Sequence, residues 1–397
     1  MIAPEPFFEP RGTPFSEFHR IRALTALGHE VDLVTYPFGQ PVTMPGLRIF
    51  RSLKPPFLRG VGIGPSAAKI PLDILLACTA IRRALSSRYD AIHSHEEGGL
   101  IGAALAMLLR LPHLYDMHSS LPQQLTNFAF SRSRFIRRVF LAIERFMIRR
   151  SRVVIVICPS LEETVRGIDP HAHTVLIENA PGSGDDRATP AEAAGVRRAL
   201  GAGDATPIVL YTGTFVAYQG LDLLFEAMAI VARARPDARL VLAGGKPDQV
   251  VRARAQARMV GIEAVTVFAG ERPAAEIPSY LLAADLLVSP RSRGTNTPLK
   301  IYQYLRSGKA IVATRLLTHT QVLSDQTAML TAATPQDFAD GILAGLQNPA
   351  HAAAVGRRAQ ELAETKYSYE AYLERTRQAC AALQLPLRPA AVVKDVA

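Results

Sequence analysis

SPRSRGTNTPLKIYQYLRSGKAIVAT, residues 289–314, continues a short apolar run and ends in another. The runs at 286–288 and 311–313 have the length of buried parallel strands. Between them, Ile301, Tyr304 and Leu305 recur at helical spacing, with Pro298 predicted as the first helical residue and Gly308 as the end. A loop between a strand and a helix offers backbone N–H groups and a positive dipole to an anion. We therefore expect a phosphate site at residues 290–300.

Alternating apolar runs and helical patterns extend outward from this stretch along the whole chain. Strands are predicted at 31–35, 47–50, 91–93, 113–115, 153–158, 174–177, 208–211, 240–243 and 265–268. Helices are predicted at 14–27, 221–234, 277–282, 335–347, 350–365 and 369–383. Such alternation is typical of α/β proteins with doubly wound parallel sheets. Only residues 1–3 are available as a strand before the first helix, so the natural start lies upstream or this strand is very short.

Residues 179–195, NAPGSGDDRATPAEAAG, are rich in Gly, Pro, Asp and Ala and indicate a linker that runs into a helix. Two Rossmann-like domains facing a cleft are expected on either side. The predicted division is an N-terminal domain at 1–180, a linker at 181–205, a C-terminal domain at 206–366, a helix at 367–384 returning to the first domain, and a loose tail at 385–397.

Composition limits the function classes. The chain has 397 residues, of which 48% are hydrophobic, and a net charge of +10, so it can bury a large core and favours acidic ligands or surfaces. Its three cysteines form no C-x-x-C pair, which indicates neither a disulfide framework nor a cysteine zinc site. The apolar runs are shorter than the roughly 20 residues of a bilayer span. A cytoplasmic protein is therefore expected.

Several strings in this order resemble the GT-B glycosyltransferases of retaining family 4. YTGTFVAYQGLDLLFEAMAIV, ARLVLAGG and residues 289–314 resemble the donor domain. ALTALGHEVDLVTY, AIHSHEEGGLIGA, LYDMHSS and SRVVIVICPSLEETV resemble the acceptor domain, and the likeness spans residues 1–383. It implies sugar transfer from a nucleotide-diphosphate sugar co-substrate, with retained configuration and no obligatory metal or other cofactor.

The same resemblance implies roles for residues of the donor domain, and here the sequence departs from the family. Thr295 and Gln303 stand where the family has glutamates that contact the donor sugar and the ribose. Gly213-Thr214 and Gln219-Gly220 stand where Gly-Arg and Lys-Gly grip the diphosphate. We expect the pocket to be rewired, with cations supplied by Arg291, Arg293 and Lys300; the alternative for each is a solvated surface charge. Asn296, Thr297 and Pro298 complete the predicted donor loop, and Thr295 and Lys300 are its candidate catalytic residues.

Polar residues at strand ends of the first half are the candidates for the acceptor side. His118 follows a strand where family members carry a histidine near the transferred sugar, and Asp116 is expected to orient it. His93, His95 and Glu96 are expected to bind acceptor hydroxyls; a metal is the weaker interpretation, and no metal is predicted. Arg11 and Gly12 lie in the first strand-to-helix turn, where the family brings backbone amides to the diphosphate or acceptor. Arg11 could equally be a surface residue.

A basic helix is predicted within residues 132–152. Arg134, Arg138, Arg145 and Arg149 share one side of it, interrupted only by Glu144, while apolar residues occupy another. This pattern favours peripheral binding to an anionic membrane surface at the inner face, and a buried helix with a solvated arginine face is the alternative. The chain shows no nucleic-acid reading module.

The predicted function is thus transfer of a sugar, of the hexosyltransferase type, to a lipid-linked or saccharide acceptor of the cell envelope. Two alternatives stay open: a catalytically silent binding subunit, which the missing glutamates permit, and a nucleotide-sugar epimerase or hydrolase of the same fold.

Overall fold

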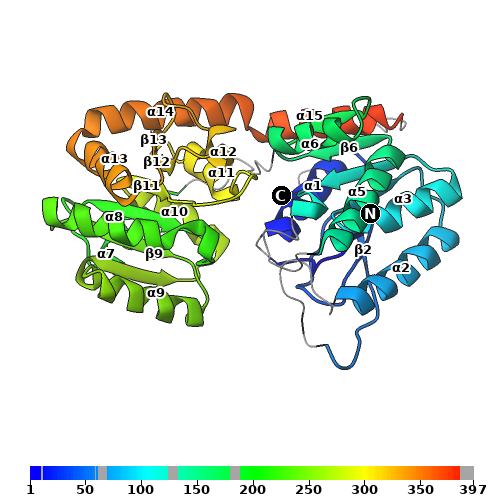
Figure 1. Cartoon of the computed structure of the whole chain (residues 1–397), viewed down its shortest axis with the longest axis horizontal. Helices are drawn as coiled ribbons and strands as arrows, with labels where there is room; N and C mark the ends of the chain where they lie inside the picture. The colour runs from blue at the N-terminus through cyan, green and yellow to red at the C-terminus, as the bar shows by residue number, and fades with distance from the viewer. Residues whose placement is uncertain (10–11, 59, 61–68, 124–132, 179–187, 385–397) are drawn as a thin grey trace, which may run out of the picture. The chain divides into compact units, whose positions relative to one another are not determined.

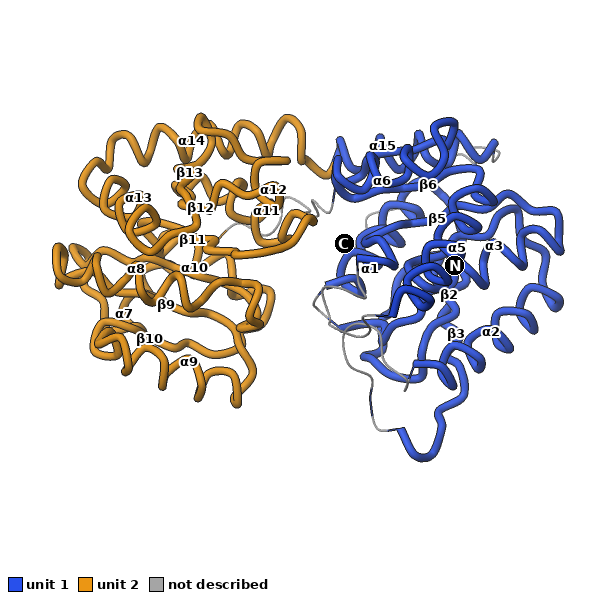
Figure 2. The backbone as a smooth tube through the Cα atoms, in the orientation of Figure 1, with its two compact units in different colours: residues 1–179, 370–397 blue, residues 180–369 orange. Residues whose placement is uncertain are grey.

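The computed structural model describes the chain except for residues 10–11, 59, 61–68, 124–132, 179–187 and 385–397 (Figure 1). Two wholly parallel sheets, one of seven strands and one of six, confirm the predicted α/β fold with Rossmann-like doubly wound sheets. The chain forms two compact units: Met1–Asn179 with Glu370–Ala397, and Ala180–Tyr369 (Figure 2).

The first unit is built on the strand order β3-β2-β1-β4-β5-β6-β7. Its strands are β1 (Ile2–Ala3), β2 (Val31–Thr35), β3 (Leu47–Arg51), β4 (Ile92–His95), β5 (His113–Met117), β6 (Val153–Val156) and β7 (Thr174–Leu176). Its helices are α1 (Gly12–Ala26), α2 (Lys69–Ser86), α3 (Gly98–Leu109), α5 (Arg134–Arg150), α6 (Pro159–Ile168) and α15 (Tyr369–Ala382). From β1 the chain adds strands first on one side of the sheet and then, from β4 onward, on the other. In sheets of this kind, ligands bind at the carboxyl ends of the strands where this switch occurs, here between β1 and β4.

Alternate residues of the central strands enter two different cores. Tyr115 and Val154 pack with α5, whereas Leu114 and Ile155 pack with α1 and α15 on the opposite face. Helices α2 and α3 pack beside Val34 and Ile92. Since side chains alternate between the faces of a strand, His93, His95 and Asp116 share the face of Leu114, under α1 and α15.

The second unit has the strand order β10-β9-β8-β11-β12-β13. Its strands are β8 (Ile208–Thr212), β9 (Arg239–Ala243), β10 (Thr266–Gly270), β11 (Leu286–Ser289), β12 (Ala310–Thr314) and β13 (Met329–Thr331). Its helices include α7 (Pro190–Ala199), α8 (Leu221–Ala234), α9 (Pro247–Met259), α10 (Ile277–Ala283), α11 (Leu299–Arg306), α12 (Leu317–Thr320), α13 (Pro335–Gln347) and α14 (Pro349–Lys366). Strand β8 has β9 on one side and β11 on the other, so the loops that leave β8 and β11 meet at one edge.

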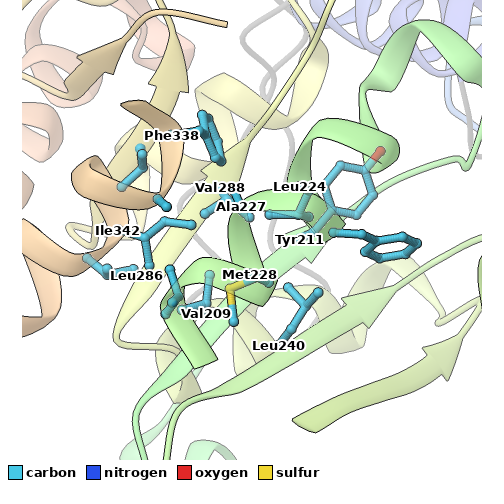
Figure 3. Packing of buried hydrophobic residues seen from close by; sticks show 14 of the residues in the cluster. Val209, Tyr211, Leu224, Ala227, Met228, Leu240, Leu286, Val288, Phe338 and Ile342 are labelled. Carbon is cyan, nitrogen blue, oxygen red and sulfur yellow. The ribbon is translucent and has the colours of Figure 1, made fainter. Parts of the chain in front are cut away.

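A large apolar core fixes the helices that cover one face of this sheet. Val209 and Val288 point from the strands toward Met228 of α8 and Ile342 of α13 (Figure 3). The alternate residues of the same strands, such as Leu210 and Leu287, point to the opposite face and enter the other core with α10, α11 and α14. Burial of each large aliphatic side chain contributes about 1.5–3 kcal/mol relative to its exposure, so both faces stabilise the sheet that carries the donor loops.

Some local predictions were wrong. Pro298 is the N-cap of α11, with ψ 136°, and the helix begins at Leu299. The strand predicted at 91–93 extends to His95, so both histidines lie within β4. One predicted alternative is confirmed: the first strand, β1, is very short, with two residues, and it pairs with both β2 and β4. Helices α2, α3, α6, α9 and α12 and strand β13 were not predicted. Helix α9 has only two buried residues, Ala253 and Ala257, and therefore shows no apolar stripe.

Candidate active site

The loop after β8 lies against the loop after β11. Gly220 has φ 74°, and a β-carbon on it would lie 2.0 Å from the carbonyl oxygen of Pro290. The amide of Ser292 donates a hydrogen bond to the carbonyl oxygen of Tyr218, at 3.1 Å. Only glycine permits so close a backbone approach at a positive φ. Residues 213–220 and 290–297, which are far apart in sequence, therefore form one surface.

Lys300, in the first turn of α11, is a buried cation on this surface. Its side chain is 8% exposed, and Nζ has no hydrogen-bond partner among the described residues. Nζ lies 3.8 Å from the centroid of the Tyr211 ring. The Tyr304 hydroxyl fixes α11 against β8 because the Thr212 amide donates to it at 2.9 Å. Burial, reinforced by Arg291, holds the pKa of Lys300 well below its usual range.

Arg291, the second cation, is held within its own loop. Its Nη1 donates to the carbonyl oxygen of Asn296 at 2.7 Å and to Oγ1 of Thr318 at 3.0 Å. Its guanidinium carbon lies 5.0 Å from the centroid of the Tyr218 ring. Burial lowers the pKa of Arg291, as for Lys300. Among the described residues neither cation forms a salt bridge, so the surface is suited to an anionic ligand.

Other predicted donor residues surround these cations to different degrees. The carbonyl oxygen of Thr214 accepts a hydrogen bond from the Tyr211 hydroxyl, which places Gly213 and Thr214 beside Lys300. Gln219 is 9% exposed, and its buried Oε1 accepts no hydrogen bond from a described residue; the same is true of the Thr297 hydroxyl. Gln303 is half-buried one turn after Lys300. Gln321 donates to the carbonyl oxygen of Thr295 at 2.6 Å, while Arg293 is exposed.

In the first unit, β4 and β5 bring together the predicted acceptor residues. His95 is in register with Asp116, and the His93 and His95 rings stack with centroids 4.8 Å apart. Oδ2 of Asp116 lies 3.5 Å from Nε2 of His93 and 3.9 Å from Nδ1 of His95. Oδ1 lies 3.3 Å from Nε2 of His118. One fully buried carboxylate thus contacts three imidazoles.

Arg20 of α1 completes this cluster, with Nε 2.9 Å from Oδ2 of Asp116. Burial alone would raise the pKa of Asp116, but Arg20 and then His118 outweigh it and hold that pKa well below its usual range. Burial alone would lower the pKa of His118, but Asp116 outweighs it and raises the pKa of the imidazole. Burial keeps the pKa values of His93 and His95 low, so these two rings are neutral near pH 7.

Carboxyl groups form the rest of the surroundings of His118. Glu96 has φ 46° and accepts hydrogen bonds from the Ser119 hydroxyl, at 3.1 and 3.0 Å. Burial raises the pKa of Glu96 to about 8. Burial also raises the pKa of Glu17 of α1 to about 7, and that of the neighbouring Glu5 well above its usual range. Near pH 7, Glu5 and Glu96 are therefore mainly protonated, whereas Glu17 titrates in that range.

A metal ion is a poor match for this cluster. One donor atom each of His93, His95 and Asp116 lie within 4.8 Å of one another, which is wide for a small cation with ligands at about 2.0–2.2 Å. Arg20 also contacts the carboxylate oxygen that the two imidazoles share. The expectation of no metal therefore stays a prediction.

Two predicted residues lie at the start of α1. Gly12 is the first residue of the helix, with φ 56°. Arg11 lies outside the described residues. The cluster of Arg20, Glu17 and Glu5 was not predicted. Arg20 and Glu17 lie beside the apolar stripe of a helix, where polar residues ordinarily face water, and Glu5 lies between β1 and α1. Tyr211, Tyr218 and Tyr304 were also missed: each looks like an ordinary core or loop aromatic until the fold brings β8, β11 and α11 together.

Comparisons with known proteins find a matching family model for a large part of each unit. Residues 206–348 match the family described as glycosyl transferases group 1, and residues 19–180 match the glycosyl transferase 4-like domain. Among curated proteins, 2-deoxystreptamine N-acetyl-D-glucosaminyltransferase of Streptomyces fradiae is 32% identical over 68% of this chain and 66% of its own length. Sulfoquinovosyl transferase SQD2 of Arabidopsis thaliana is 24% identical over 79% and 58%. The chain thus spans two thirds or less of the length of these relatives.

Solved structures show the same fold at low identity. Sucrose-phosphate synthase of Thermosynechococcus elongatus has a TM-score of 0.78 with 20% identity, covering 96% of this chain and 98% of its own. The Anabaena protein HepE, solved in complex with UDP, has a TM-score of 0.75 with 17% identity, covering 96% and 99%. Both likenesses concern the fold. The chain therefore carries the two domains of the group 1 glycosyltransferases, a glycosyl transferase 4-like domain followed by a group 1 domain.

Proposed function

We propose that this chain transfers a sugar from a nucleotide-diphosphate sugar to a lipid-linked or saccharide acceptor of the cell envelope, with retention of configuration. The observation that carries the proposal is the pair Lys300 and Arg291, two buried cations that form no salt bridge with a described residue. A diphosphate supplies the missing negative charge. As the sugar–phosphate bond breaks, charge grows on the leaving diphosphate, and fixed cations in a dry site stabilise it.

Each described donor residue has a part in this proposal. Lys300 and Arg291 neutralise the diphosphate, while the backbone of Gly213 and Thr214 approaches it closely. Gln219 and Thr297 offer buried polar groups for further hydrogen bonds. Gln303 hydrogen-bonds the ribose with an amide in place of a carboxylate, and Thr295 contacts the donor sugar. In this assignment the site keeps its charge balance after the loss of two cations and two carboxylates. No metal is required.

His118 is the proposed residue of the first unit that contacts the transferred sugar. Its protonated imidazole donates to a sugar hydroxyl, and Asp116 fixes the ring. Glu96, His93 and His95 line the same cluster and are assigned to acceptor hydroxyls. The names of relatives include compounds as different as 2-deoxystreptamine and D-inositol 3-phosphate, so a ring with several polar substituents is the shared feature that we carry over to the acceptor.

A product assay tests the proposal directly. The purified chain is incubated with a panel of UDP, GDP and ADP sugars, together with bacterial lipid extract or soluble saccharides, and products are identified by mass spectrometry and NMR. Transfer with a retained anomeric configuration is expected. An inverted product would contradict retention. Free sugar or an epimer would support the hydrolase or epimerase alternative, and nucleotide binding without any product would support a silent subunit.

Helix α5 is the proposed contact with the inner face of the membrane. Arg134, Arg138, Arg145 and Arg149 are exposed, and Phe135, 73% exposed, lies on the same helix. The sequence predicted that Glu144 interrupts this positive face, and that prediction is wrong. Glu144 is buried and accepts hydrogen bonds from the Ser120 hydroxyl and the Leu121 amide. Exposed arginines beside an aromatic residue suit anionic headgroups. None of the described helices is both long and apolar enough to cross a bilayer.

Vesicle cosedimentation tests this surface. Changing the four arginines of α5 to Gln is expected to abolish binding to anionic vesicles at low salt. The matched control changes Arg198, Arg233, Arg357 and Arg358, four exposed arginines of the second unit, and removes the same charge. An equal loss of vesicle binding in both variants would mean that binding depends on net charge alone, and would contradict a docking role for α5.

A further inference from the structure

Arg20 is a buried cation that joins three elements distant in sequence. It lies in α1 and is 2% exposed. Its Nε contacts Asp116 of β5 at 2.9 Å, and its Nη1 donates to Oγ1 of Thr376 of α15 at 3.1 Å. Its guanidinium carbon lies 4.9 Å from the centroid of the Tyr372 ring, also in α15. The last described helix of the chain thus supports the residue that neutralises Asp116.

The two oxygens of Asp116 have different neighbours. Oδ2 faces Arg20, His93 and His95, whereas Oδ1 faces His118 at 3.3 Å. Arg20 therefore fixes the rotation of the carboxylate and leaves one oxygen directed at His118. A planar guanidinium held by several contacts does this better than a flexible ammonium.

We propose that Arg20, supported by Thr376 and Tyr372, is a positioning residue that keeps Asp116 charged and thereby fixes the ring orientation and the proton of His118. The catalytic use of His118 rests on the proposed function. The connection from α15 through Arg20 and Asp116 to His118 does not, and it is measurable without turnover.

The charged groups around Asp116 and His118 determine how loss of Arg20 changes the protonation of His118. Glu5, Glu96 and His95 face His118, and Glu17, His93 and His95 face Asp116. A buried carboxylate that has lost its cation takes up a proton. The Asp116–His118 pair still holds one proton without Arg20, but that proton moves from the imidazole to the carboxyl group. His118 then becomes a neutral ring with an altered hydrogen-bonding pattern.

NMR of the full-length chain with ¹⁵N-labelled histidine tests this directly. In the unsubstituted protein the His118 ring nitrogens are expected to show the imidazolium signature at pH 6.5. In Arg20→Met they are expected to show the neutral signature at the same pH, because Met keeps the packing and removes the charge. An unchanged His118 titration in a folded Arg20→Met protein would overturn the proposal.

A double-mutant cycle separates this connection from general damage. Asp116→Asn alone is expected to give neutral His118, and Arg20→Met added to it is expected to change the His118 signature no further. Additive changes would show that Arg20 acts on His118 by another route and would overturn the proposal. The dispersion of backbone amide signals from the first unit serves as the folding control, because Arg20 lies in that unit and nucleotide binding by the second unit would not report its fold.

Two milder variants keep the proposal testable if Arg20→Met does not fold. Arg20→Lys restores the charge, so His118 is expected to regain its imidazolium signature. Thr376→Val removes the hydrogen bond between Arg20 and α15 but keeps the contact with Tyr372; kcat is expected to fall severalfold, while KM for the donor stays within about twofold. Failure of Arg20→Lys to restore the signature, or an unchanged kcat in Thr376→Val, would overturn it. No transfer by the unsubstituted chain would instead refute the proposed function, and the NMR result would stand.

Discussion

The polar centres of the two units are balanced in opposite ways. In the first unit, cations meet carboxylates within the protein: Arg20 pairs with Asp116, and Lys69 pairs with Glu97 at 2.8 Å. In the second, Lys300 and Arg291 are buried without a salt bridge to any described residue. A centre whose arginine and lysine are already paired with carboxylates recognises ligands mainly by exchanging hydrogen bonds. A centre with excess positive charge is completed by the ligand, and its binding energy depends on the charge of that ligand.

Substitution of Lys300 should have the largest effect, because it removes a buried cation of the second centre and with it most of the affinity for a nucleotide diphosphate. We expect Lys300→Met to weaken binding of a nucleotide diphosphate about 1000-fold, because loss of one partner from a buried charge pair costs about 4 kcal/mol. Calorimetric titration with UDP, GDP and ADP measures it. Arg293→Met is the matched control: it removes one cation of the same loop, but an exposed one, and should change affinity less than about twofold. Equal effects would contradict the distinction between the two residues.

The carboxyl groups of the first centre should make its stability depend on pH. Burial raises the folded-state pKa of Glu17 to about 7, above its ordinary value of 4.5, so the folded state holds a proton that the unfolded state has lost. This contribution is complete below pH 4.5 and is lost as pH rises through about 7, up to about 3 kcal/mol. Denaturant unfolding at several pH values should show the decline, and Glu17→Gln should flatten it.

The control for that experiment is Glu226→Gln, which changes an exposed glutamate of α8 in the second unit. It should leave the pH profile of unfolding as it is in the unsubstituted chain. A profile that Glu17→Gln does not alter would show that the first centre is not held together by shared protons.

Proton linkage should sharpen the comparison at the second centre. Burial depresses the pKa of free Lys300, and a bound diphosphate raises it again. Above the depressed pKa, where free Lys300 is uncharged, binding therefore takes up a proton and restores the cation. Affinity should therefore fall with rising pH, by at most about tenfold per unit, in the range above the depressed pKa. Titrations in buffers of different ionisation enthalpy measure the proton uptake. Uptake that persists in Lys300→Met would assign it to another group.

The smallest effect should be on stability. A buried cation without a partner is unfavourable, so Lys300→Met should raise the free energy of unfolding of the ligand-free chain by about 1 kcal/mol. Chemical denaturation without nucleotide tests this, with Arg293→Met again as the control. A loss of stability would mean that the contact of Lys300 with Tyr211 outweighs the cost of its burial.

The same contrast explains what the sequence could predict. The alternation of apolar runs predicted both sheets apart from strand β13, because buried parallel strands tend to be continuous apolar runs. Lys300, Arg291 and the loop that holds them lie within 26 consecutive residues, and a strand-loop-helix unit is readable locally. His118 and Asp116 were found through their place at the end of a strand.

The first centre is assembled from distant segments, and its neighbours were therefore missed. Arg20 and Glu17 lie in a helix whose apolar stripe is clear, and nothing local shows that α15 covers its polar side as well. Pro298 was misplaced by one residue because its φ suits both the N-cap and the first helical position. Glu144 was assigned to the arginine face because periodicity alone does not reveal the buried Ser120 and Leu121 groups that it binds.

Because α15 belongs to the first unit but is the last described helix of the chain, it also determines when that unit can be completed during synthesis. Every strand of the seven-stranded sheet is made before residue 180, and the whole second unit follows before α15 leaves the ribosome. Domains generally fold as they emerge. Until Thr376 and Tyr372 arrive, Arg20 has no partner from α15, and the face of the sheet that carries His93, His95 and Asp116 lacks one of its two covering helices. The half of the protein that is translated first is thus the half that is finished last.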